Sequence, residues 1–320
     1  MKKFYINVQG GTGLNEALAS FISYIKSVGD DNGNKDYEFY VCSPYFDVFE
    51  ACPYVSGVYK PEELKDLILD ANEYGGELIL HRLYDMDLFV KKQLNYSQAW
   101  AKLMNIPFTD TEGGTKVKSI LEPLRVYPAL TQNIAAIKDA IKKFDDFVIM
   151  QFTGGQSPLV QVPQGKDEKG NPFADWSKVP YDYNREPLKR HYPIEKAQEF
   201  VDLYAKEHPK TAIILYQLPN EPAPKNNNTF LFVAPYLAYY ELAKEAKEVI
   251  CIDSSLQHLV AGVVPTTVIW AHSRPEHFGY SYNNNVIQEA RIKDLLYFTA
   301  LGPSGAKVNY IEPADLMKEI

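Results

Sequence analysis

VICIDSSLQHLVAGVVPTTVIWAHSRP, residues 249–275, places a short helical pattern between two apolar runs. The apolar runs at 249–252 and 266–270 predict two buried strands. The spacing of apolar residues between them predicts a helix over 255–262, and Pro265 prevents that helix from continuing. The stretch therefore predicts a strand–helix–strand unit, the repeating unit of parallel α/β sheets.

The polar turn inside this stretch carries candidate ligand-binding groups. Asp253, Ser254 and Ser255 offer side-chain oxygens that can cap the start of the helix. A helix N-terminus presents free backbone N–H groups and a partial positive charge, which suit a phosphate. His258 lies one turn inside the helix and can face the same crevice. The turn therefore predicts a phosphate-binding site.

The same alternation of strands and helices extends along the whole chain. In the first half we expect strands at 3–8, 38–42, 55–59 and 77–81 and helices at 15–25, 62–73, 87–103 and 131–143. In the second half we expect strands at 145–152, 211–216, 249–252 and 266–270 and helices at 194–207, 235–247 and 255–262. Residues 156–189 show little periodicity and predict a long excursion. We therefore expect α/β domains over 1–144 and 145–288, with 289–320 packing back across the join.

Composition limits the classes of protein to which the chain can belong. Its 320 residues are 46% hydrophobic and 23% charged, as in globular proteins with ample core. No segment approaches ~18 uninterrupted apolar residues, so no transmembrane helix is expected. Three cysteines without a pattern favour a reducing compartment and a cytoplasmic location. The net charge of −8 argues against a protein that coats nucleic acid.

Four segments together resemble the heptosyltransferase-like glycosyltransferases of family nine. Residues 253–261 resemble the family's donor motif Asp-Ser/Thr-Gly-x-x-His-Leu-x-Ala, with Ser255 in place of the glycine. Residues 7–13 match the family's opening strand and glycine turn, and 40–45 match its second strand. Residues 190–193, Arg-His-Tyr-Pro, are similar to its Lys-x-Trp-Pro. The resemblance covers most of the chain.

The resemblance implies a fold, a reaction and site residues. The fold is GT-B, in which two Rossmann-like parallel-sheet domains face a central crevice. The reaction is inverting transfer of a hexosyl, heptosyl or pentosyl group from a nucleotide-diphosphate sugar to an acceptor hydroxyl, without a metal or other cofactor. The implied donor-binding residues are Thr153, Gly154, Arg190, Glu221, Asp253, Ser254, Ser255 and His258. The residues expected on the acceptor side are Gly11, Thr12, Gly13, His81 and Arg82.

The catalytic base is the point at which the chain departs from the family. Leu14 occupies the position of the family's Asp, and Glu16 is the nearest acid on the same helix start. Asp85 and Asp87 are the reserve candidates. They form an Asp-Met-Asp sequence similar to the Asp-x-Asp of metal-dependent glycosyltransferases, but that motif belongs to a different architecture. A helix cap is the alternative role for Asp85, and we expect no metal.

Two further questions stay open at the level of sequence. The acceptor is either a surface glycan or, in a viral setting, a hydroxymethylated nucleic-acid base. A basic surface would favour DNA modification, and its candidate residues are Lys91, Lys92, Lys102, Lys116, Lys118 and Arg125. The second question is whether the chain is an enzyme. Leu14 is compatible with a non-catalytic nucleotide-sugar or glycan-binding protein that has lost the base.

Overall fold

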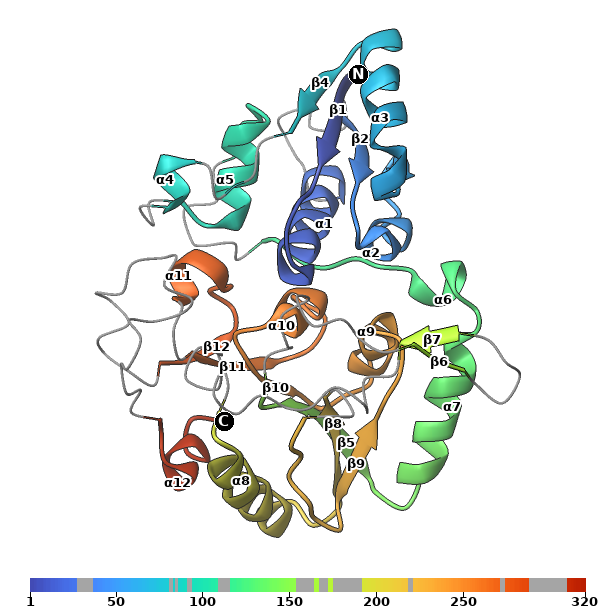
Figure 1. Ribbon diagram of the computed structural model, residues 1–320. Coiled ribbons are helices and arrows are strands. Elements are labelled where there is room, and N and C mark those ends of the chain that lie inside the picture. The colour runs from blue at the N-terminus through green and yellow to red at the C-terminus, as the bar shows by residue number, and fades with distance from the viewer. Residues whose placement is uncertain are drawn as a thin grey trace.

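The computed structural model describes residues 1–27, 37–80, 83, 86–90, 94–108, 116–153, 164–166, 172–174, 192–217, 221–270, 274–287 and 310–320. Its described strands form two parallel sheets, one in each half of the chain, and a separate antiparallel hairpin (Figure 1). The fold predicted from the alternation of strands and helices is confirmed.

The first sheet has the strand order β3-β2-β1-β4, with every neighbouring pair parallel. Its strands are β1 (Lys2–Asn7), β2 (Tyr37–Cys42), β3 (Gly57–Tyr59) and β4 (Glu77–Ile79). The helical segments of this half are α1 (Thr12–Ser27), α2 (Phe46–Glu50), η2 (Pro61–Glu63), α3 (Leu64–Glu73), α4 (Asp87–Val90), α5 (Tyr96–Leu103), α6 (Pro123–Val126) and α7 (Leu130–Ile141).

The second sheet has the strand order β12-β11-β10-β5-β8-β9, again parallel throughout. Its strands are β5 (Asp146–Gln151), β8 (Thr211–Tyr216), β9 (Thr229–Phe232), β10 (Val249–Ile252), β11 (Thr266–Trp270) and β12 (Asn284–Ile287). Its helices are α8 (Ile194–Glu207), α9 (Leu237–Ala243), α10 (Ser255–Leu259), α11 (Pro275–Phe278) and α12 (Pro313–Leu316). Counted from β5, this is the doubly wound order 3-2-1-4-5-6 of dinucleotide-binding folds.

Strand β5 shows how the second sheet buries both of its faces. Val148 and Met150 point to the face covered by α8 and α12, where they join a cluster with Phe200 and Leu316. Ile149 points to the opposite face and joins the larger cluster that contains residues of α9 and α10. Side chains alternate between the two faces of a strand. The apolar run therefore has no polar side, as a parallel sheet covered on both faces requires.

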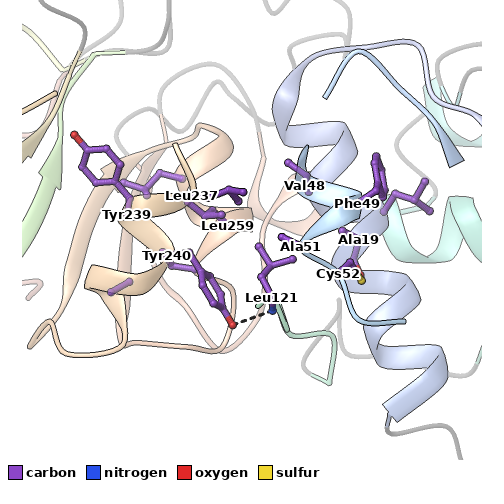
Figure 2. Close-up of a cluster of buried hydrophobic side chains, with 14 of the residues drawn as sticks. Ala19, Val48, Phe49, Ala51, Cys52, Leu121, Leu237, Tyr239, Tyr240 and Leu259 are labelled. Carbon is purple, nitrogen blue, oxygen red and sulfur yellow. Dashed lines mark hydrogen bonds between the residues drawn. The ribbon is translucent and has the colours of Figure 1, made fainter. Parts of the chain in front are cut away.

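The two halves share one continuous apolar cluster. Figure 2 shows Val48, Phe49 and Ala51 on the side of the first sheet and Leu237, Tyr239 and Leu259 on the side of the second. Leu121 lies between them, and its backbone N–H donates to the Tyr240 hydroxyl at 3.1 Å.

The segment that joins the halves is hydrogen-bonded to both. Ser119 N–H donates to Ala261 O at 2.7 Å, and Glu122 N–H donates to Ala51 O at 2.7 Å. The cluster and this segment hold the carboxyl edge of one sheet against that of the other.

Several elements differ from those predicted. The helix expected over 87–103 is divided into α4 and α5, because Asn95 caps α5 in a reciprocal capping box with Gln98. The helix expected over 255–262 ends at Leu259, and Gly262 then adopts a positive φ of 69°. The sequence reading also missed α6, α11, β9, β12 and the hairpin of β6 (Gln164–Lys166) and β7 (Pro172–Ala174) within the 156–189 excursion.

The described part of the C-terminal segment packs against the second half. Helix α12 contacts α8, the Tyr192 hydroxyl donates to Ile311 O at 2.7 Å, and Lys196 pairs with Glu312 at 2.5 Å. The rest of this segment, residues 289–309, lies outside the described residues. The boundaries at 144 and 288 and the packing of 289–320 across the join stay predictions. None of the described helices is both long and apolar enough to cross a membrane.

Candidate active site

Polar side chains gather where the strand order of the second sheet reverses. Strands β5 and β10 lie side by side at this switch point, and their connections leave in opposite directions. Gln151 and Thr153 come from the end of β5, and Asp253 and Ser254 follow β10. Ligands of open α/β sheets bind outside the carboxyl ends of the strands at such a point. The topology therefore marks this group of residues as the candidate donor-binding cluster.

A chain of hydrogen bonds connects the cluster. Ser254 Oγ donates to Gln151 Oε1 at 2.5 Å, and Gln151 Nε2 donates to the backbone oxygen of Thr153 at 2.9 Å. Thr153 Oγ1 donates to Glu221 Oε2 at 2.7 Å, which adds the loop after β8. The residues joined by these hydrogen bonds are mostly buried, with Thr153 6% and Glu221 8% exposed. Hydrogen-bonded groups of low exposure have little freedom to move, so the cluster is preorganised.

The turn after β10 is built as the sequence predicted. Ser254 has extended backbone dihedral angles at the N-cap, and its Oγ accepts from Leu256 N–H at 3.2 Å. Asp253 Oδ1 accepts from Gln257 Nε2 at 2.8 Å, which ties the aspartate to the following helix. Asp253 thus holds the turn together.

His258 lies at the contact between the two halves. It is 3% exposed, and its Nδ1 is 3.0 Å from the Tyr280 hydroxyl. Tyr96 of α5 meets the imidazole edge to face, with ring centroids 5.5 Å apart. A Cβ added to Gly13 of α1 would lie only 3.2 Å from His258 Cδ2. Gly13 therefore lets the first turn of α1 approach α10 closely, and Figure 1 shows these helices next to each other.

Helix α1 separates Leu14 and Glu16 onto different sides. Leu14 is 3% exposed and joins the apolar cluster, packed so closely over Gly10 that an added Cβ there would lie 2.6 Å from Leu14 Cδ2. Two positions along a helix turn a side chain by about 200°. Glu16 accordingly interacts electrostatically with Tyr216 and Tyr280 of the second half. Position 14 faces the core in this chain, and position 16 faces the donor half.

Glu16 is an unusual carboxyl group. It is 2% exposed, and neither of its oxygens has a hydrogen-bond partner among the residues that the structure describes. Burial raises the pKa of Glu16 well above its ordinary value, and the nearby Asp47 carboxylate raises the pKa further. A carboxyl group with a raised pKa in a closed site is a frequent property of catalytic acids and bases.

Several predicted site residues lie outside the described residues, namely His81, Arg82, Asp85, Gly154 and Arg190. Asp87 is the first residue of α4, but its side chain is not among those described. Gly11 and Thr12 lie at the start of α1, where Gly11 O accepts from Asn15 Nδ2 at 3.0 Å. The structure therefore brings Gly13 and His258 together, relates Glu16 to His258 through Tyr280, and connects Thr153, Glu221 and Ser254.

Sequence reasoning missed three residues of this region. Gln151 links Ser254 to Thr153, Tyr216 ends β8 beside Glu16, and Tyr280 contacts His258. Gln151 and Tyr216 had a usable signal, because each is the last residue of a buried parallel strand, where ligand-binding side chains concentrate. Tyr280 had none, since it follows α11 in an irregular turn.

The described residues also bear on the question of metal binding. Among them, no group of three or more His, Cys, Asp or Glu side chains is arranged to hold an ion. Two members of the Asp-Met-Asp sequence and its neighbour His81 are not part of that set, so the absence of a metal stays a prediction.

Solved structures identify the architecture. Neither a family model nor a curated protein sequence matches the chain. A family nine glycosyltransferase from Veillonella parvula superposes with a TM-score of 0.59 at 11% identity, covering 99% of this chain and 95% of that one. The Escherichia coli heptosyltransferase WaaC with ADP gives 0.52 at 10% identity, with 99% and 96% covered. The E. coli ADP-heptose lipopolysaccharide heptosyltransferase II gives 0.50 at 11% identity, with 100% and 97% covered. The chain therefore has the GT-B fold, in a form similar to that of the family nine heptosyltransferases.

Proposed function

We propose that the chain is an inverting glycosyltransferase that moves a sugar from a nucleotide-diphosphate donor to an acceptor hydroxyl. The observation that carries the proposal is the position of Glu16. This buried carboxyl group has no hydrogen-bond partner among the described residues and lies on α1, where it interacts electrostatically with Tyr216, as does Glu221 of the polar cluster at the switch point of the second sheet. One of the superposed enzymes is named for ADP-heptose, a nucleotide-diphosphate sugar, which supports the same donor class.

The proposed reaction is a single displacement. The acceptor oxygen forms a bond to the anomeric carbon while the bond from that carbon to the diphosphate oxygen breaks. Glu16 takes the proton of the acceptor hydroxyl, and the nucleoside diphosphate leaves with the bonding electron pair. Attack opposite to the leaving group inverts the anomeric centre. General-base assistance of this kind contributes ~10²–10⁴ in rate.

The donor-binding roles follow from the cluster. Ser254 and the backbone of its turn bind the diphosphate, and His258 donates a hydrogen bond to a phosphate oxygen. Glu221, held by Thr153 at the end of the neighbouring strand, binds the nucleoside. In this proposal Arg190 supplies the positive charge that stabilises the departing diphosphate. The remaining predicted residues, Gly154 and Ser255 on the donor side and Gly11, Thr12, His81 and Arg82 on the acceptor side, keep the roles proposed for them.

The buried position of Glu16 makes this arrangement the closed one. An acceptor cannot reach a side chain that is 2% exposed while α1 rests on α10. The apolar cluster around Leu121 joins the halves at the connecting segment and serves as the hinge. The close approach of Gly13 to His258 is the part that separates to admit substrates.

Release of nucleoside diphosphate from a panel of nucleotide sugars tests the proposal. We expect release by the wild type, accelerated by a glycan acceptor, and loss of that release in Glu16→Gln. If a hydroxymethylated DNA were the acceptor, its affinity would fall steeply with salt, whereas that of a neutral glycan would not. Binding of a nucleotide sugar without release of nucleoside diphosphate from any donor would favour the non-catalytic alternative and refute the proposed enzymatic activity.

A further inference from the structure

Tyr280, whose hydroxyl contacts His258, is held in place by its own packing. Tyr280 is 5% exposed and stacks on Tyr282, with ring centroids 5.3 Å apart and an interplanar angle of 18°. The Tyr282 hydroxyl donates to Val117 O at 2.8 Å, so the stack is fixed to the segment that joins the two halves. The packed neighbour therefore sets the position of the Tyr280 hydroxyl before any ligand binds.

The chemistry of the pair decides which atom holds which proton. Burial raises the pKa of Tyr280, so the side chain is a neutral phenol. A phenol is a stronger hydrogen-bond donor than acceptor, because its oxygen lone pair is delocalised into the ring. The unprotonated nitrogen of a neutral imidazole is a strong acceptor. With His258 neutral, a donating Tyr280 hydroxyl makes the 3.0 Å contact an O–H···Nδ1 bond, which leaves the one imidazole proton on Nε2.

The orientation of the His258 ring decides where its Nε2 proton points. Relative to a Cβ placed on Gly13, His258 Cδ2 lies at 3.2 Å and Nε2 at 3.7 Å. The Nε2 edge of the ring therefore faces the first turn of α1, on the side where the two halves meet. A donor N–H at this place is what a diphosphate oxygen requires, whereas an unprotonated Nε2 would repel it.

We propose that Tyr280 is a positioning residue that holds His258 in the Nε2–H tautomer, so that His258 donates to the diphosphate of the sugar donor. The second half of this statement rests on the proposed function. The first half concerns the protein without ligand and can be tested separately.

Nitrogen NMR of the full chain, labelled with ¹⁵N-histidine and without donor, tests the tautomer. His258 is assigned as the one of six imidazoles that disappears in His258→Gln. We expect a pyridine-type Nδ1 and a pyrrole-type Nε2 in the wild type, and loss of this pattern in Tyr280→Phe. Tyr282→Phe is the matched control, because it removes a hydroxyl from the same stack but keeps the ring that packs on Tyr280, and it should keep the wild-type pattern. A proton on Nδ1 in the wild type, or an unchanged spectrum in Tyr280→Phe, would overturn the inference.

Calorimetric titration of the donor tests the second half. Losing the hydroxyl removes about one hydrogen bond's contribution, so Tyr280→Phe should weaken donor binding about 2- to 12-fold, and Tyr282→Phe less than about 2-fold. Equal affinities in wild type and Tyr280→Phe would refute the role in donor binding. If the NMR pattern is as expected but no nucleotide sugar binds the wild type, the proposed function fails while the assignment of the tautomer stands.

Discussion

Replacing Glu16 by glutamine should stabilise the protein and abolish most of its turnover. Glutamine has nearly the same shape but cannot ionise, and no hydrogen-bond donor in the described part of the chain stabilises the charge of the wild-type carboxyl. Because the folded-state pKa of Glu16 is raised above the unfolded value, its contribution to stability is complete at low pH and is lost as pH rises through the raised pKa. Each unit of the shift corresponds to about 1.4 kcal/mol.

The gain in unfolding free energy should therefore grow with pH. At pH 5 the two proteins should unfold at similar temperatures, and at pH 8 Glu16→Gln should be more stable by about 1.4 kcal/mol for each unit by which the pKa of Glu16 is raised, because only the wild-type side chain must ionise in a buried place. Turnover should fall by at least ~10²-fold with donor affinity nearly unchanged. Calorimetric melting across pH and steady-state kinetics measure the two effects. Glu207→Gln, on an exposed side of α8, is the control and should alter neither. Near-normal turnover, or a stability difference independent of pH, would refute the reasoning.

Three further predictions concern the region where α1 meets α10. His258→Ala should weaken donor binding by roughly 1.5–3 kcal/mol in calorimetric titration, the scale of a charge-assisted hydrogen bond; unchanged affinity in a folded variant would remove His258 from the site. Asp47→Asn removes a charge that raises the pKa of Glu16, so the rising limb of the pH–rate profile should move to lower pH; a shift to higher pH would contradict that pairing. Saturating donor should reduce the radius of gyration in small-angle scattering as α1 closes on α10, and a constant radius would count against closure.

The predictable parts of the fold are the elements that are determined by residues close together in the sequence. The unit at 249–270 combines two apolar runs with a capped helix, and β10 and β11 have the predicted bounds. Strand β9 was missed, because its four residues lie at the edge of the sheet with Leu231 half exposed. A short edge strand gives little periodicity to detect.

The site was predictable to a similar extent. The turn at 253–255 could be found, because a cap and a strand end are neighbours in sequence. The side of α1 on which Glu16 lies depends on where Leu14 packs, which the local sequence does not encode, and the role of Glu16 as the base stays a prediction. The contact of Tyr280 with His258 spans 22 residues through an irregular turn, and no local pattern encodes it.

The central claim is that a nucleotide-diphosphate sugar binds at the switch point of the second sheet, opposite Glu16. The most direct test is the melting temperature of the protein against a panel of nucleotide sugars, because a ligand that binds only the native state stabilises it by mass action. At 100 times its Kd a donor should add about 2.7 kcal/mol to the wild type, and clearly less to His258→Ala at the same concentration. If no nucleotide sugar raises the melting temperature, or if His258→Ala responds as the wild type does, the account is contradicted.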